Sequence, residues 1–102
     1  MKYKIEYIVD GCFSGPIRII NSSSDYKLVC PGDVLFIKRP NPDVVLSFGK
    51  ITGIISEVGG KLSHIAIVSR ENNIPYVRLE NAANILKNGI IVNICDGFIY
   101  VG

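Results

Sequence analysis

The abundance of β-branched apolar residues constrains this chain more than any other feature of its sequence. Seventeen isoleucines and ten valines stand among 102 residues, and such side chains fit the pleated surface of a sheet well. They occur in short runs separated by glycine, proline, asparagine and serine, which end strands and form turns. No run approaches the roughly 18 apolar residues of a membrane-spanning helix. We therefore expect one domain over residues 1–102, with a single core and no membrane association.

Charge and cysteine content argue against several functional classes. The net charge is only +2 and the basic residues are scattered, which does not predict nucleic-acid binding. Cys12, Cys30 and Cys95 lie far apart and form no CxxC pair. We expect neither a disulfide framework nor a zinc site, and we interpret these residues as buried thiols of a reducing cytoplasm. The N-terminus lacks the long apolar segment of a signal peptide, which also favours a cytoplasmic protein.

Turn signals divide the chain into short expected elements. Strands are expected over Lys4–Val9, Pro16–Ile20, Val34–Ile37, Ile51–Ile55, Tyr76–Leu79, Ile90–Ile94 and Phe98–Val101. Helical segments are expected over Asp43–Phe48, and from a cap at Asn81 to Lys87 ahead of Gly89. A polar turn is expected over Asn21–Asp25, and Asp96-Gly97 predicts a hairpin turn. Many strands with two or three helices indicate the α/β class.

The segment His64–Asn73 fits either a buried strand or a helix by its pattern alone. We interpret it as a helix, because Ser63 is a favourable N-cap residue and the polar stretch RENN ends ahead of a proline. The histidine, the only one in the chain, then stands in the first helical turn. Free backbone N–H groups there favour an anion and disfavour an imidazolium.

A neutral imidazole in that position can act as a nucleophile, and Gly59 and Gly60 would let the backbone approach it closely. The arrangement suits a histidine that accepts a phosphoryl group. A lone histidine beside an apolar run is also a common structural residue, and a Gly-Gly pair is also a common turn. The residues alone leave both interpretations open.

The stretch Thr52–Val77 resembles the signature of the phosphohistidine, or swivelling mobile, domain of the PEP-utilising enzymes. That family includes pyruvate phosphate dikinase, PEP synthase, enzyme I of the sugar phosphotransferase system and rifampicin phosphotransferase. The resemblance is carried by Ser56-Glu57, Gly59-Gly60, Ser63-His64, Ala66, Arg70-Glu71 and Ile74-Pro75. Weaker similarity extends over nearly the whole chain, with departures at Ser69, which replaces an alanine, and at Arg78-Leu79, which replace Val-Gly.

The resemblance implies a swivelling β/β/α fold in which His64 carries the phosphoryl group on a ring nitrogen. It implies that Gly59, Gly60 and Ser63 form the loop that supports the phosphate. The implied partners are a PEP/pyruvate-binding barrel and, in several members, an ATP-grasp nucleotide-binding domain, which use Mg and PEP or ATP. We expect no cofactor or metal on this domain itself, and no complete enzyme without the partners.

Three further residues near the motif have expected supporting or docking roles. Glu57 is expected to orient the loop or the histidine by hydrogen bonding, and Lys61 to be a solvated loop residue that attracts anions. Arg70 is expected to form a structural ion pair, for which Glu57 is a candidate partner, or a docking contact. Arg70 lies about 9 Å of helix rise from His64, which argues against a shared phosphate contact. Two alternatives to a phosphocarrier remain. One is a docking module that keeps the fold without phosphorylation, and the other is a swivel subunit of a hydro-lyase.

Overall fold

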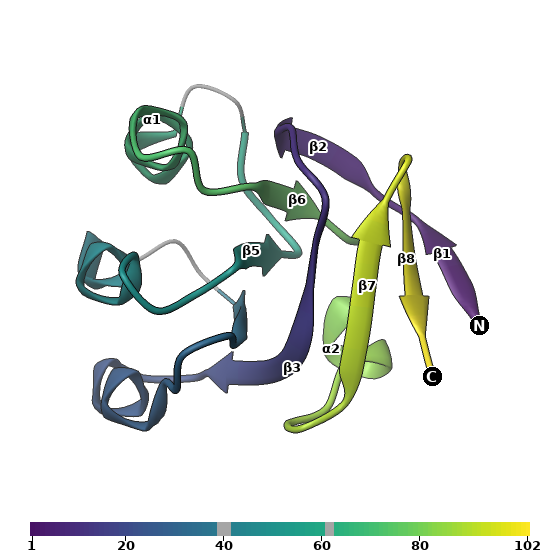
Figure 1. Ribbon diagram of the computed structural model, residues 1–102, viewed down its shortest axis with the longest axis horizontal. Coiled ribbons are helices and arrows are strands. Elements are labelled where there is room, and N and C mark those ends of the chain that lie inside the picture. The colour runs from purple at the N-terminus through teal and green to yellow at the C-terminus, as the bar shows by residue number, and fades with distance from the viewer. Residues whose placement is uncertain (39–41, 61–62) are drawn as a thin grey trace.

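The chain folds into one curved, eight-stranded sheet with short helical segments around it (Figure 1). The computed structural model describes residues 1–38, 42–60 and 63–102. The strands are β1 (Lys2–Lys4), β2 (Glu6–Val9), β3 (Phe13–Ile20), β4 (Val34–Ile37), β5 (Gly53–Ser56), β6 (Tyr76–Arg78), β7 (Ile91–Cys95) and β8 (Phe98–Val101). The helices are α1 (His64–Glu71), α2 (Ala82–Ile85) and the 3₁₀ segments η1 (Ser23–Leu28) and η2 (Pro42–Ser47). The expected mixed α/β class is confirmed.

The strand order β1-β8-β7-β3-β4-β5-β6-β2 makes the sheet nearly close on itself. β1 and β2 stand at the two ends of this order, yet only Ile5 separates them in the chain. β1 pairs with β8 and β2 pairs with β6, so the N-terminal segment joins both ends of the sheet. The prediction of one strand over Lys4–Val9 was wrong here, because Ile5 leaves the ladder and its N–H donates to the Gly97 carbonyl at 3.0 Å.

β3 connects the two halves of the sheet. Its first half pairs antiparallel with β7, and its second half, from Ile17, pairs parallel with β4. The strand begins at Phe13, three residues before the expected start at Pro16. Gly15 allows the strand to start early, because the chain passes so close to the Gly32 carbonyl oxygen there that a Cβ would collide with it. Its φ of +148° is also one that other residues rarely adopt.

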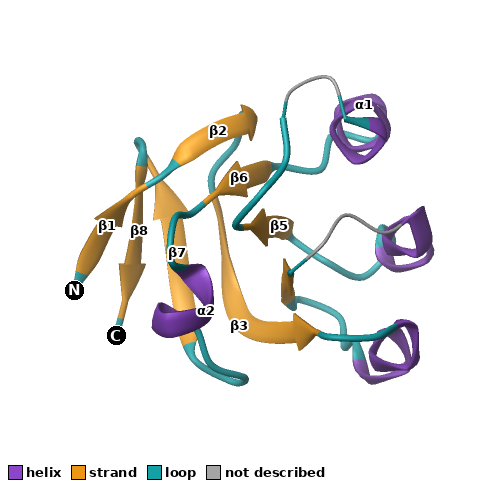
Figure 2. Ribbon diagram, turned by 180° about the vertical axis from the view of Figure 1, so that it is seen from behind, coloured by secondary structure: helices purple, strands orange, loops and turns teal. Residues whose placement is uncertain are grey.

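Two apolar cores lie on the two faces of the parallel strands. All four residues of β4 are fully buried, as expected for a strand covered on both faces. Val34 and Phe36 belong to the core between the two halves of the sheet, and Leu35 and Ile37 to the core beneath the helices. Figure 2 shows α1 in a row with η1 and η2 on one side of the parallel strands, with α2 on the other side.

Several expected local elements are confirmed. The structure contains β4 at Val34–Ile37, β8 at Phe98–Val101, a helical segment that starts at Pro42 and a helix that starts at His64. Asp96 and Gly97 have φ angles of 55° and 88°, as a tight hairpin turn between β7 and β8 requires. The expected polar turn over Asn21–Asp25 runs into η1 instead. None of the helices in the described ranges is long and apolar enough to cross a membrane.

The predictions that the chain has no disulfide and that its cysteines are buried thiols were wrong. Cys12 and Cys95 form a disulfide across 83 positions of the sequence, and Cys30 is exposed as a free thiol. The physical reason is the antiparallel pairing of β3 with β7. Phe13 lies opposite Ile94 in that ladder, so the residues that flank this pair, Cys12 and Cys95, become neighbours. Linear spacing gives no sign of this proximity.

Candidate functional site

His64 is the first residue of α1 and its side chain is exposed. Ser63 is the N-cap, as expected, with an extended backbone conformation and a hydroxyl oxygen that accepts from the Ala66 N–H at 3.2 Å. The first backbone bond of the helix runs from the Ile67 N–H to the Ser63 carbonyl at 3.0 Å. The N–H groups of His64 and Ile65 therefore precede the intrahelical bonds and point toward the open end of the helix. The placement of the histidine at a helix N-terminus is confirmed.

The two glycines of the preceding turn have different tasks. Gly59 has a φ of +132°, and a Cβ on it would lie 2.6 Å from the Tyr76 hydroxyl. Only glycine suits that position. A Cβ on Gly60 would meet nothing within 4 Å among the described residues, and the Gly60 carbonyl accepts from the Ser63 N–H at 3.1 Å. Gly59 thus allows the turn to pack closely against the Tyr76 hydroxyl. The Gly60 carbonyl links the turn to the helix cap through its hydrogen bond with Ser63. The predicted solvated lysine, Lys61, lies outside the described residues.

A pair of buried hydroxyl groups lies beneath this turn. Ser56 at the end of β5 and Tyr76 at the start of β6 are both fully buried, and their side-chain oxygens are 2.9 Å apart. The Ser56 hydroxyl also donates to the Val58 carbonyl at 2.6 Å. Burial raises the pKa of Tyr76, and the hydrogen bond with Ser56 lowers it in part. The phenol is therefore neutral and able to donate. Sequence reasoning did not assign a role to Tyr76.

Glu57 does not reach His64 or Arg70. Its carboxylate accepts from the Ala83 N–H at 2.7 Å and so caps the first turn of α2. The Glu57–Arg70 ion pair was predicted wrongly, because Glu57 directly follows Ser56, the last residue of β5, and successive residues of an extended chain point to opposite sides. Ser56 points beneath the helices, and Glu57 points toward α2. The same bond corrects the cap predicted at Asn81, which has a φ of 61° and no capping hydrogen bond from its side chain.

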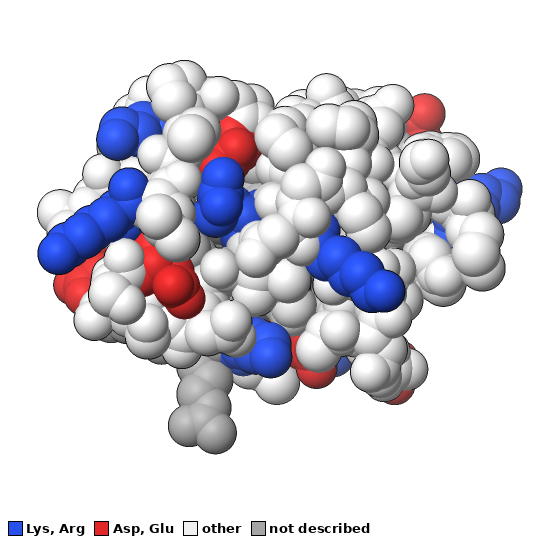
Figure 3. Space-filling view, turned by 90° about the horizontal axis from the view of Figure 1, so that it is seen from below, with Lys and Arg blue, Asp and Glu red and all other residues white. Residues whose placement is uncertain are grey.

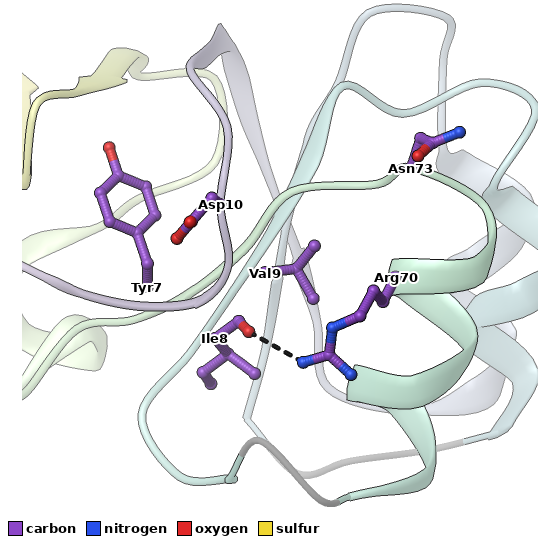
Figure 4. A pocket seen from close by; sticks show the side chains of 6 residues that line it. All are labelled: Tyr7, Ile8, Val9, Asp10, Arg70 and Asn73. Carbon is purple, nitrogen blue, oxygen red and sulfur yellow. Dashed lines mark hydrogen bonds between the residues drawn. The ribbon is translucent and has the colours of Figure 1, made fainter.

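Arg70 lies at the opposite end of α1 from His64. Its guanidinium donates to the Ile8 carbonyl of β2 at 3.3 Å (Figure 4). Around it is an open cleft of about 460 Å³, lined by Tyr7, Ile8, Val9, Asp10, Arg70 and Asn73. Figure 4 shows Tyr7 and Asp10 on one side of the cleft and Arg70 and Asn73 on the other. This cleft is separate from the histidine, so Arg70 holds the helix to the edge strand and does not belong to the His64 site.

The described residues offer no set of side chains for a metal ion, since no three of His, Cys, Asp and Glu lie together in them. Charge is also dispersed. On the face drawn in Figure 3, the visible Lys and Arg side chains are separated by uncharged residues and carboxylates. One of the basic residues, Arg18, is paired with the buried Asp33 at 3.2 Å. The chemistry available at the N-terminus of α1 is therefore that of the imidazole itself.

Comparison with known proteins adds an independent line of information. Residues 29–98 match the family described as PEP-utilising enzyme, mobile domain. The phosphoenolpyruvate synthase of Pyrococcus furiosus is 36% identical over 95 residues, which cover 90% of this chain and 12% of that protein. The chain spans only 10% to 13% of the length of the first curated relatives that it matches.

Two solved structures are similar over different extents. The solution structure of an Enzyme I protein matches with a TM-score of 0.58 and 27% identity, over 71% of this chain and 31% of that one. Aconitase X of Thermococcus kodakaraensis matches with a TM-score of 0.73 over 100% of this chain and 98% of that one. The second match has 18% identity and shows the fold alone.

Proposed function

Because the chain belongs to the PEP-utilising enzyme mobile-domain family, we propose that it carries a phosphoryl group on His64 between partner active sites. The observation that supports this most is the exposed imidazole at the first residue of α1, directly after the glycine turn and the Ser63 cap. A histidine with a purely structural role would be expected to be buried, whereas His64 is exposed.

The proposed step needs only the ring and an incoming donor. The lone pair of a neutral ring nitrogen attacks the phosphorus atom and forms the P–N bond. The bond from phosphorus to the leaving oxygen breaks, and that oxygen takes the electron pair. The product adds negative charge next to the N–H groups of His64 and Ile65, which precede the first intrahelical bond and favour an anion. These two N–H groups stabilise phosphorylated His64 until the phosphoryl group is transferred to the acceptor.

The partners would supply the remaining chemistry. We propose a PEP/pyruvate-binding barrel as one partner and, as a further possible donor site, an ATP-grasp domain. Mg and PEP or ATP would bind there and not on this chain. The small share of each relative that the chain spans supports this division of tasks. The domain would swivel as a β/β/α unit between the two sites. We propose that it does so in the cytoplasm, where the Cys12–Cys95 disulfide would be an exception to the reduced state of most thiols.

The test is to phosphorylate the full chain in two ways. Potassium phosphoramidate serves as a small donor, and isotopically labelled PEP serves with a PEP synthase whose own mobile domain has been deleted. We expect one acid-labile, base-stable phosphate on His64, mapped by mass spectrometry at neutral to basic pH, and none on the His64→Ala protein. Full labelling of His64→Ala, or an acid-stable phosphoserine, would refute the mechanism.

A second candidate function is a docking or swivel module without phosphorylation. The specific observation in its favour is the fold match with aconitase X over the whole chain. The same experiment separates the two functions, because a pure docking module would take no label on His64 from PEP and the partner. The intact Ser63-His64 pair behind Gly59-Gly60 favours the phosphocarrier, since docking alone does not need a nucleophile at this position.

A further inference from the structure

The buried hydroxyl of Tyr76 lies directly below the turn that leads to His64. Tyr76 is fully buried at the start of β6, on the face that packs beneath α1. Its oxygen is 2.9 Å from the Ser56 hydroxyl. A buried phenol in an apolar core costs free energy unless its hydroxyl has a partner. A phenylalanine could fill the same space, so the hydroxyl of Tyr76 must contribute through its hydrogen bond.

The direction of the hydrogen bonds follows from counting protons. A carbonyl can only accept, so the Ser56 hydroxyl donates its one proton to the Val58 carbonyl. Ser56 must then accept from Tyr76, which donates. The hydrogen bonds therefore run in one direction, from the phenol through Ser56 to the backbone of the turn, and they hold the Val58 carbonyl in place.

Steric contact fixes the turn against the same hydroxyl. The Cα of Gly59 lies so close to it that a Cβ would be only 2.6 Å from the oxygen. From there the Gly60 carbonyl accepts from the Ser63 N–H, and the Ser63 hydroxyl accepts from the Ala66 N–H. A connected set of contacts thus links the core to the first turn of α1.

We propose that Tyr76 is the positioning residue for His64. Its hydroxyl sets the height of the turn over the sheet, and the turn sets where Ser63 caps the helix and where the imidazole meets a phosphoryl donor. Its effect on phosphoryl transfer rests on the proposed function, while its effect on the turn does not. Tyr76 touches neither donor nor product, so it acts only through Ser56, Gly59 and the cap.

The experiment compares Tyr76→Phe with Tyr26→Phe in the full chain. Each variant removes one buried phenol oxygen and keeps the ring. The Tyr26 hydroxyl has no hydrogen-bond partner among the described residues and lies in η1, which makes it the matched control. Amide hydrogen exchange is measured at Ser63 and Ala66, with Phe36 in β4 as the core reference.

In Tyr76→Phe we expect the Ser63 and Ala66 amides to exchange about fivefold faster, the change expected for one lost hydrogen bond. Phe36 lies in a fully buried strand and exchanges through global unfolding, so its rate should change only as far as the free energy of unfolding of each variant does. Transfer from PEP through the partner should fall about tenfold or more, because misplacement of a nucleophile is costly. Labelling by phosphoramidate, which needs only an exposed ring, should stay within about twofold of wild type.

The outcomes separate the two proposals. If the wild-type chain takes no label on His64, the proposed function fails, and the amide exchange still decides whether Tyr76 positions the turn. If the Ser63 and Ala66 amides keep their wild-type exchange rates in Tyr76→Phe, the positioning role is wrong. It is also wrong if Tyr26→Phe speeds their exchange equally, because the effect would then be one of general stability.

Discussion

The contact between Gly59 and Tyr76 can be measured as a coupling free energy. Alanine at Gly59 has two costs. A φ of +132° is strained for any residue with a Cβ, at about 1–3 kcal/mol. The new Cβ would also lie 2.6 Å from the Tyr76 oxygen, and such overpacking costs about 1–3 kcal/mol. We expect Gly59→Ala to lower the free energy of unfolding by about 2–6 kcal/mol, the sum of the two.

The second substitution removes only the steric part of that cost. Tyr76→Phe alone should cost about 1 kcal/mol, for one buried hydrogen bond. In the double variant, the nearest atoms to the new Cβ become the Ser56 oxygen at 3.6 Å and the ring carbon of residue 76 at 3.7 Å, both ordinary contacts. The double variant should therefore be more stable than the sum of the single effects predicts, by about 1–3 kcal/mol.

The assay is urea unfolding of the four proteins, followed by circular dichroism, with the m-values checked for equality. Gly60→Ala is the internal control, because its Cβ would meet no described atom within 4 Å and its φ is not positive. It should change stability by about 1 kcal/mol or less. Additivity of Gly59→Ala and Tyr76→Phe within about 0.5 kcal/mol would refute the contact on which the positioning role depends.

Three further predictions test separate parts of the structure. Ser63→Ala removes the N-cap acceptor of α1 and should cost about 1 kcal/mol in urea unfolding, while His64 stays open to labelling by phosphoramidate. Cys12→Ser opens a disulfide that spans 83 positions and should cost up to about 4–5 kcal/mol; equal urea midpoints for the two proteins would contradict the bridge. The free energy of unfolding should fall as pH rises above about 10, because burial raises the pKa of Tyr26 to about 12 and also raises that of Tyr76, so the unfolded chain loses these protons first. Urea unfolding at pH 9 to 11 checks this, and Tyr26→Phe should flatten the decline.

The parts of the site that were predicted correctly depend on local sequence. A helix cap is decided by residues within about four positions, so Ser63 and His64 could be placed at a helix start without knowledge of the fold. The hairpin at Asp96-Gly97 is local in the same sense. Residues within a few positions decide both the helix start at Ser63 and the turn at Asp96-Gly97, so the structure agrees with the prediction at both places.

The parts that were missed depend on how distant strands pair. Tyr76 meets Ser56 only because β5 and β6 are parallel with Ile54 opposite Tyr76, and no spacing in the sequence gives that register. The disulfide follows from the β3–β7 ladder in the same way. One signal was available for the buried pair. Ser56 follows the apolar run of β5 at a position that points inward, which indicates a buried hydroxyl in need of a partner.

The Tyr76 hydroxyl can hold the turn through Ser56 only while it keeps its proton. The pH range in which it does so should therefore include the range in which a phosphorus–nitrogen bond is stable. That bond is labile in acid and stable in base, so the proposed phosphoryl transfer through His64 requires the turn to keep its geometry at neutral to mildly alkaline pH. An ionised phenolate could only accept, and Ser56 would then have to choose between Tyr76 and the Val58 carbonyl for its one proton. A tyrosine of ordinary pKa already keeps its proton in that range, and burial, which raises the pKa of Tyr76, extends the range further. A serine or threonine at residue 76 would have a proton too, but its oxygen would sit several ångströms short of the turn. The long neutral phenol can both reach Ser56 and donate to it, which is why the hydroxyl that positions an exposed histidine lies in the core.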